Sequence, residues 1–447
     1  MDEKRRICLL NDSFPPVIDG VANAVVNYAQ NIEKNYGKAV VVTPKYPEAD
    51  DAAFDFPIVR YPSIDLTKQT GYRAGMPFSP QLMRTLGEHG PDLIHSHCPI
   101  ASTVVARLLR DQECAPLVLT YHTKFAEDIA RTIRSEPIRT AAARMIVENI
   151  SACDEVWTVS KGAGEDLRAF GYEGEYTVMP NGVDLPVGRV PDEAVRRVCA
   201  GYDLPPELPT YLFVGRMVWY KGMRITIDAL KLLADEGKDF RMLFVGGGCH
   251  LQEVKDYCAE LGLADKVFFV PPVQDRDELR AWYCRADLFL FPSTYDTNGL
   301  VVREAAACSL PSVLIAGSCA SDGATDGRNC FLIEANAESM ADCLRRIHGK
   351  RELLRSLGEA ACRELYLSWE DAVRLACERY EIILEKHRMG EYPKQKTPSA
   401  ELIRIAAESI AAINKLHVGL RDMQSELRAE NKQFQERVSE LLKHWIS

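Results

Sequence analysis

The chain has 447 residues, of which 47% are hydrophobic and 26% charged, with a formal net charge of −10. This composition is typical of a globular protein, and the length predicts two core-forming domains with an appendage. The acidic balance excludes a general nucleic-acid binder, which would carry a basic field.

The beginning of the sequence, MDEKRRICLLNDSF, predicts a first strand. Its short apolar run does not match the hydrophobic region of a signal peptide. No stretch approaches the apolar length of a membrane-spanning helix, so contact with a membrane is expected only from the surface. The 14 cysteines include no C-x-x-C pair, which favours reduced thiols in a cytosolic protein and argues against structural zinc.

Short β-branched runs alternate with amphipathic helical segments almost from end to end, which predicts parallel sheets covered on both faces. The expected strands fall into two groups, 6–12, 39–44, 92–97, 116–122 and 155–160, then 210–216, 241–247, 266–271, 287–293 and 311–316. The fold class is therefore α/β, with two doubly wound Rossmann-like domains facing across a cleft and a long C-terminal helix.

The run EGEYTVMPNGVDLPVGRVPD is rich in Gly and Pro and marks the hinge between the two domains. We expect a first domain over 1–186 and a second over 187–368. A helix over 369–390 is expected to return toward the first domain, and residues 391–447 to form a helical extension. Ligands of such sheets bind beyond the carboxyl ends of the strands.

The stretch YDTNGLVVREA follows an expected strand and therefore lies at such an end. Asn298 and Gly299 can begin a helix whose free N–H groups face an anion, and Gly299 lets that backbone come close. The carboxylate of Glu304 suits two adjacent ribose hydroxyls, and Asp296 would meet what lies beyond the phosphates. The alternative is an acid at the start of a surface helix, favoured by the helix dipole.

Two cations, Arg216 and Lys221, follow the first strand of the second half. Their spacing suits a diphosphate, which arginine can engage with two hydrogen bonds. They would neutralise a leaving nucleoside diphosphate without a metal. Two solvated loop cations are the alternative.

In the first half, His122 ends an expected strand at the edge that faces the hinge, which indicates a functional histidine, with a core histidine hydrogen-bonded to the backbone as the equal alternative. His95 and His97 have a similar placement but no acidic or Cys partner, and we interpret them as structural. Gly20 lies at a loop-to-helix junction, where it either cradles an anion or only marks the loop. The glycines at 246–248 lack the G-x-G-x-x-G spacing, so dinucleotide binding is weakly indicated.

Taken in order, the Gly20 loop, YHT, VMPNGVD, VGRMVWYKG and the D-x7-E stretch resemble glycosyltransferase family 4 over roughly residues 5–385. The resemblance implies a retaining, metal-independent transferase without a cofactor. It assigns His122 and Asp296 to the catalytic centre. It assigns to donor binding the residues Gly20, Arg216, Lys221, Asn298, Gly299, Leu300, Val301 and Glu304.

The sequence departs from the family pattern at two positions. The first acid of the motif is usually Glu but is Asp296 here, one methylene shorter, and the common Phe before the motif glycine is Asn298. DTNGLVVREA together with GSCASDGATDGRNCFLIE is most similar to bacterial enzymes that glycosylate diacylglycerol.

The resemblance therefore predicts a hexosyltransferase of glycolipid biosynthesis that moves glucose from UDP-glucose to a lipid such as diacylglycerol. We expect it to be cytoplasmic and peripheral at the inner face of the cell membrane. The alternatives are a transferase with a non-lipid acceptor and a non-catalytic scaffold that binds a nucleotide sugar. A nicotinamide-dependent dehydrogenase lacks support because no glycine fingerprint follows the first strand, and a sugar epimerase of the same architecture is a minor alternative.

Two segments predict partners. Residues 124–145 interleave arginines with apolar residues and could lie on an anionic membrane surface, with a solvated helix face as the alternative. From Leu402 the tail carries a 3–4 apolar spacing, which predicts a coiled-coil homodimer through residues 399–445, or a tail folded back on the chain or onto lipid.

Overall fold

The computed structural model describes residues 4–17 and 19–392. The predicted tail helix and its dimer interface lie outside the described residues. The chain forms two compact units. The first comprises the described parts of Met1–Leu119, Arg144–Glu155 and Ile382–Ser447, and the second comprises Thr120–Ala143 and Val156–Glu381.

The first sheet has seven parallel strands in the order β3-β2-β1-β6-β7-β8-β9. Its strands are β1 (Arg5–Leu10), β2 (Gly37–Pro44), β3 (Ile58–Tyr61), β6 (Leu93–Ser96), β7 (Leu117–Tyr121), β8 (Glu155–Thr158) and β9 (Thr177–Val178). The boundary between the units runs through β7 and β8, so the segment that follows β7 groups with the second unit.

The second sheet has six parallel strands in the order β12-β11-β10-β13-β14-β15. They are β10 (Thr210–Val214), β11 (Arg241–Val245), β12 (Val267–Val270), β13 (Leu288–Phe291), β14 (Ser312–Ile315) and β15 (Phe331–Ile333). Strands β10 and β13 are fully buried, as expected for parallel strands with helices on both faces. A separate antiparallel hairpin joins β4 (Ser63–Asp65) to β5 (Arg73–Gly75).

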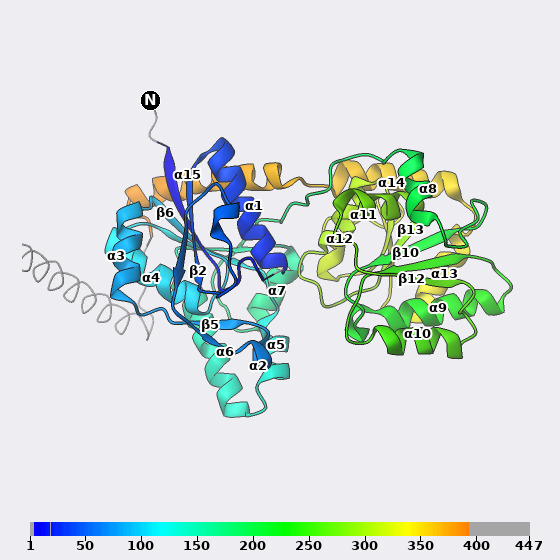
Figure 1. Cartoon of the computed structure of the whole chain (residues 1–447), viewed down its shortest axis with the longest axis horizontal. Helices are drawn as coiled ribbons and strands as arrows, with labels where there is room; N and C mark the ends of the chain where they lie inside the picture. Colours follow the sequence, from blue (N-terminus) through cyan, green and yellow to red (C-terminus); the bar gives the residue numbers. More distant parts are fainter. Residues whose placement is uncertain (1–3, 18, 393–447) are drawn as a thin grey trace, which may run out of the picture. The chain divides into compact units, whose positions relative to one another are not determined.

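Figure 1 shows α11, α12 and α14 on one side of the second sheet and α9, α10 and α13 on the other. The helices of the first half are α1 (Gly20–Asn35), α2 (Thr67–Thr70), α3 (Pro80–His89), α4 (Ala101–Glu113), α5 (Phe125–Thr132), α6 (Glu136–Ser151) and α7 (Lys161–Ala169). Those of the second half are α8 (Asp192–Cys199), α9 (Met223–Asp235), α10 (Leu251–Glu260), α11 (Arg276–Arg285), α12 (Leu300–Ala307), α13 (Ala337–Ile347), α14 (Arg351–Glu364) and α15 (Trp369–Arg388). Short 3-10 turns are η1 (Asp51–Ala53), η2 (Trp219–Lys221) and η3 (Cys319–Ser321).

The predicted α/β class with two Rossmann-like sheets is confirmed, because both sheets are parallel and doubly wound and all ten expected strands are present. The sequence missed β3, β9, β15 and the β4–β5 hairpin, which have two to four residues each and so little periodicity to detect. The domain boundaries at 186 and 368 stay a prediction.

Candidate active site

The loop after β13 leads into α12 through Gly299, which has a φ of 62° and precedes the first helical residue. A Cβ added to Gly299 would lie 2.9 Å from the Cα of Ala320, so both conformation and space demand glycine here. The helix start predicted at Asn298–Gly299 is thus confirmed. The first N–H groups of α12 point from the carboxyl edge of the sheet, where an anion can bind.

Lys221 lies at the end of η2, after β10, and its side chain is buried although charged. Its Nζ lies 2.8 Å from Oδ1 of Asp296. The hydroxyl of Ser293 donates to the other carboxylate oxygen, Oδ2, at 2.6 Å. The loops after β10 and β13 therefore meet in one hydrogen-bonded cluster, which we call the Lys221 cluster.

The glycine after Lys221 fixes this geometry. Gly222 has a φ of 79°, and a Cβ there would lie 2.0 Å from the carbonyl oxygen of Pro292. The two loops are in backbone contact at this point, and any larger residue would push them apart. Close backbone packing thus holds the Lys221 cluster together.

Arg216, in contrast, is exposed. It follows β10 directly, and its guanidinium has no hydrogen bond or ion pair within residues 4–17 and 19–392. The glycines at 246–248 support this segment, since Met217 N donates to Gly247 O at 2.8 Å and a Cβ on Gly248 would lie 2.5 Å from Met217 O. The glycine run thus positions the Arg216 loop, a role that the sequence did not indicate.

Glu304 lies inside α12 and is buried with both carboxylate oxygens engaged. Arg276 donates to Oε1 at 2.7 Å, and the hydroxyl of Tyr283 donates to Oε2 at 2.9 Å. Burial, followed by the charge of Glu304, raises the pKa of Tyr283 well above its usual value, so this phenol stays a donor. A carboxylate has about four acceptor positions, so the fixed Glu304 can still accept from two ligand hydroxyls.

The sequence reasoning missed Arg276, Tyr283 and Ser293. Arg276 begins α11 just after β12, so the same rule of strand carboxyl ends would have identified it. Tyr283 and Ser293 give no sequence signal of their own, because their role depends on a partner elsewhere in the chain.

His122 follows β7 directly and is buried. Burial lowers its pKa to about 3, so the imidazole is neutral at physiological pH. Thr297, between Asp296 and Asn298, donates its hydroxyl to the backbone carbonyl of His122 at 2.7 Å, and both residues belong to the second unit. His95 and His97 are buried with ring centroids 4.0 Å apart, in agreement with a structural role.

Gly20 is the first residue of α1, as the sequence predicted. The carboxylate of Asp19 caps the helix by accepting from the N–H groups of Val21 and Ala22 at 2.9 and 2.7 Å. A Cβ on Gly20 would meet nothing within 4 Å. Two amide groups of this helix start are therefore occupied, and the donor-binding role of Gly20 stays a prediction.

The site thus combines a helix start, two cations and a fixed carboxylate at the carboxyl edge of a Rossmann-like sheet. This is the chemistry of an enzyme that binds a sugar nucleotide and transfers its sugar, with no glycine fingerprint for a dinucleotide. The class indicated by fold and site is a glycosyltransferase.

Comparisons with known proteins identify the family. A family model described as Glycosyltransferase Family 4 matches residues 18–186, and one described as Glycosyl transferases group 1 matches residues 200–364. The D-inositol 3-phosphate glycosyltransferase of Nocardia farcinica is 30% identical over 383 residues, which are 80% of this chain and 82% of that protein. The chain belongs to glycosyltransferase family 4 and is a hexosyltransferase.

Other relatives differ in what their names say they act on. The alpha-monoglucosyldiacylglycerol synthase of Acholeplasma laidlawii is 23% identical over 368 residues, 80% of this chain and 91% of that protein. Sucrose-phosphate synthase from Thermosynechococcus elongatus shares the fold with a TM-score of 0.70 at 21% identity, over 86% of this chain and all of that one. Anabaena HepE in complex with UDP-glucose has a TM-score of 0.65 at 17% identity, over 84% of this chain and 99% of that one.

None of the helices in the described part of the chain has the length and hydropathy needed to span a bilayer.

Proposed function

We propose that the enzyme transfers glucose from UDP-glucose to a lipid acceptor such as diacylglycerol, with retention of the anomeric configuration. The observation that carries the donor site is the contact between Lys221 and Asp296, which joins the two loops at the carboxyl edge of the second sheet. Solved structures of this fold hold UDP and UDP-glucose, which supports a nucleotide-sugar donor.

In the proposed reaction the bond between the anomeric carbon and the diphosphate oxygen breaks, and the acceptor hydroxyl oxygen bonds to the same carbon. The hydroxyl proton passes to the departing diphosphate. Negative charge grows on that group, and Arg216, Lys221 and the N–H groups from Asn298 to Val301 are the donors that would stabilise it. Glu304 would hold the ribose hydroxyls.

His122 and Asp296 are proposed to act at the transferred sugar. A neutral imidazole offers one donor and one acceptor, which suits a sugar hydroxyl and avoids a charge beside a forming oxocarbenium ion. Asp296 would accept from a sugar hydroxyl with the lone pairs that Lys221 and Ser293 leave open. Because Asp296 is one methylene shorter than Glu, its backbone would have to lie closer to the sugar for the carboxylate to reach it.

Exposed apolar side chains support a lipid surface as the acceptor environment. On α6, Ile138 and Met145 are 58% and 48% exposed and lie two helical turns apart on one face. Arg144 on α6 and Arg134, which precedes the helix, are also exposed. Apolar side chains flanked by arginines favour binding to an anionic membrane surface.

A second exposed group lies on the β4–β5 hairpin and the chain after it. Five large apolar residues there are at least one third exposed, namely Ile64, Leu66, Tyr72, Met76 and Phe78. So many exposed apolar side chains within 15 residues are unusual for a surface in contact with water alone. They support membrane contact from the first unit.

D-inositol 3-phosphate is a second candidate acceptor, because the relative named for it has the higher identity, 30% against 23% for the synthase from Acholeplasma laidlawii. The test is a matrix of labelled UDP-glucose, UDP-galactose and GDP-mannose against diacylglycerol in anionic liposomes and soluble D-inositol 3-phosphate. Glucosyl-diacylglycerol from UDP-glucose alone is the expected product. Transfer only to the inositol phosphate would refute the lipid acceptor, and no transfer or hydrolysis of any donor would favour the scaffold alternative.

A further inference from the structure

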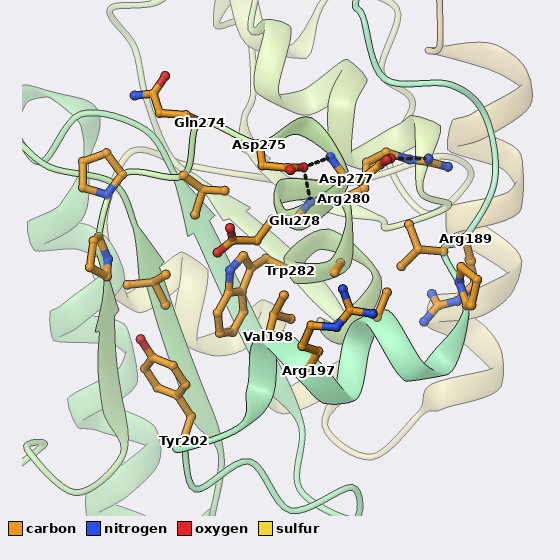
Figure 2. A pocket seen from close by; sticks show the side chains of 18 residues that line it. Arg189, Arg197, Val198, Tyr202, Gln274, Asp275, Asp277, Glu278, Arg280 and Trp282 are labelled. Atoms are coloured by element: carbon orange, nitrogen blue, oxygen red, sulfur yellow. Dashed lines mark hydrogen bonds and ion pairs between the residues drawn. The ribbon is translucent and has the colours of Figure 1, made fainter.

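The second unit contains a cavity of about 1030 Å³ that the proposed reaction does not use. It lies between α8, α11 and the segment 270–275, as Figure 2 shows. Its walls combine apolar and aromatic side chains, Val198, Tyr202, Pro271, Pro272 and Trp282 among them, with charged side chains from α8 and α11. The volume is at the upper end for small-molecule sites in proteins.

The cavity is separate from the candidate donor site. Arg276 and Tyr283, which hold Glu304, are seven residues apart on α11 and share one helix face. Glu278 and Trp282, which line the cavity, are four residues apart and lie on the opposite face. Helix α11 thus stands between the two sites and contributes different residues to each.

The cavity contains polar groups without a protein partner. The indole of Trp282 is 2% exposed, and its N–H has no hydrogen-bond acceptor within the described chain. An unpartnered buried donor is costly, so this group indicates a ligand or a water. Trp282 is held in place by an edge-to-face contact with Tyr202, at 5.3 Å between ring centroids.

Charged groups of both signs lie around the indole. The carboxylate of Glu278 and the guanidinium of Arg197 have no ion pair or side-chain hydrogen bond with any residue that the structure describes. Arg280, by contrast, is engaged with Asp277 at 3.2 Å and with Gly188 O at 3.1 Å. Figure 2 shows Glu278 and Trp282 projecting from α11 and Arg197 projecting from α8.

This set of groups selects for a chemical class. The free carboxylate accepts hydrogen bonds, whereas the indole and the guanidinium only donate them. A strongly anionic ligand would meet Glu278, Asp275 and Asp277, and a cationic ligand would meet the arginines. Hydroxyl groups both donate and accept, and the apolar faces of a sugar ring suit walls of tyrosine and proline. We propose that the cavity binds a neutral polyhydroxylated ligand of one or two hexose units, at a site distinct from the donor site.

The experiment measures binding of maltose to the full chain by calorimetry in the presence of saturating UDP, with glucuronate and glucosamine as charged comparisons. Trp282→Phe removes the N–H but keeps a ring, and should weaken maltose binding about fivefold. Arg197→Gln removes a charged donor, and should weaken it about tenfold. Arg196→Gln, the adjacent exposed position outside the cavity lining, is the matched control and should leave maltose binding unchanged.

UDP binding in each variant reports whether the protein is folded and whether the donor site is intact, so a failure of the proposed reaction and a failure of this site are distinguishable. Weakened maltose binding in both cavity variants, with UDP binding retained, is the expected result. No maltose binding to the unaltered protein, or binding that either cavity variant leaves unchanged, would overturn the proposal. Equal or tighter binding of a charged sugar would overturn its chemical class.

Discussion

Replacing Lys221 by alanine should reduce both stability and turnover, because this lysine is buried and paired. Its Nζ lies 2.8 Å from Oδ1 of Asp296, and the two side chains are 11% and 21% exposed. At that distance the Coulomb attraction is about 6 kcal/mol for an effective dielectric of 20. Desolvation offsets much of it. Removing one partner of a fully buried pair costs about 3–5 kcal/mol, so for this partly exposed carboxylate we expect about 2–3 kcal/mol.

Turnover should fall by on the order of a hundredfold, as when one preorganised donor to a developing charge is lost. The measurements are transfer from labelled UDP-glucose and the thermal midpoint of unfolding. Arg216→Ala is the informative comparison. Its side chain is exposed, so its loss should change stability by less than about 0.5 kcal/mol while reducing turnover by a similar factor.

A double variant separates the two effects. Lys221→Ala with Asp296→Asn leaves no unpaired charge, so it should regain most of the lost stability and none of the turnover. Lys231→Ala, which breaks an exposed ion pair with Asp235 on α9, should cost less than about 0.5 kcal/mol. Near-normal turnover in both Lys221→Ala and Arg216→Ala, or no recovery of stability in the double variant, would refute the reasoning.

Further predictions follow from the glycine at the helix start, the buried histidine and the exposed apolar surfaces. Gly299→Ala should lose about 2 kcal/mol of stability and most UDP affinity, because Gly299 has a positive φ and no space for a side chain. Gly20→Ala has nothing within 4 Å of the added Cβ and should change stability by less than about 0.5 kcal/mol. Thermal unfolding measures the stability of each variant, and calorimetry measures its UDP affinity. His122→Ala should keep UDP affinity and lose transfer; intact transfer per folded molecule would contradict a role at the sugar. Burial lowers the pKa of His122 from 6.5 to about 3, so between these pH values the unfolded chain binds a proton that the folded chain does not. The free energy of unfolding should therefore fall as the pH drops from 6.5 toward 3. His122→Phe should flatten this part of the plot of stability against pH. Ile138→Ser and Phe78→Ser should each reduce flotation with anionic liposomes, and flotation that does not respond to anionic lipid would remove the support for a membrane acceptor.

The sequence sufficed to predict the fold class and the edge of the sheet that carries the site. Long buried strands are recognised by their unbroken apolar runs, and the rule of carboxyl ends then selects the loops after β10 and β13. The start of α12 at Gly299 was equally predictable, because a glycine between a strand end and an apolar helical run marks the point where the backbone turns into the helix.

The contact between Lys221 and Asp296 was not predictable, because the two residues are 75 positions apart. They meet because β10 and β13 are neighbours in the sheet, although two strands separate them in the chain. Strand order depends on how the helices pack, which local periodicity does not encode. The same reason hid Tyr283, whose function depends on a carboxylate in a different helix.

The Lys221 cluster also bears on how the proposed reaction is driven. With Asp296 beside it, Lys221 contributes little net charge to the site, and Glu304 is likewise balanced by Arg276. In the proposed reaction the exposed Arg216 and the start of α12 would therefore supply most of the attraction for a resting diphosphate. Asp296 accepts from the ammonium group and is itself held by the Ser293 hydroxyl, so the position of the ammonium group is fixed before the reaction begins. As the bond between the sugar and the diphosphate breaks, negative charge would grow on the diphosphate. Its attraction to Lys221 would therefore be stronger in the transition state than in the ground state. Only interactions of that kind accelerate the chemical step, so in the proposed reaction an acid beside the lysine would aid turnover rather than donor affinity.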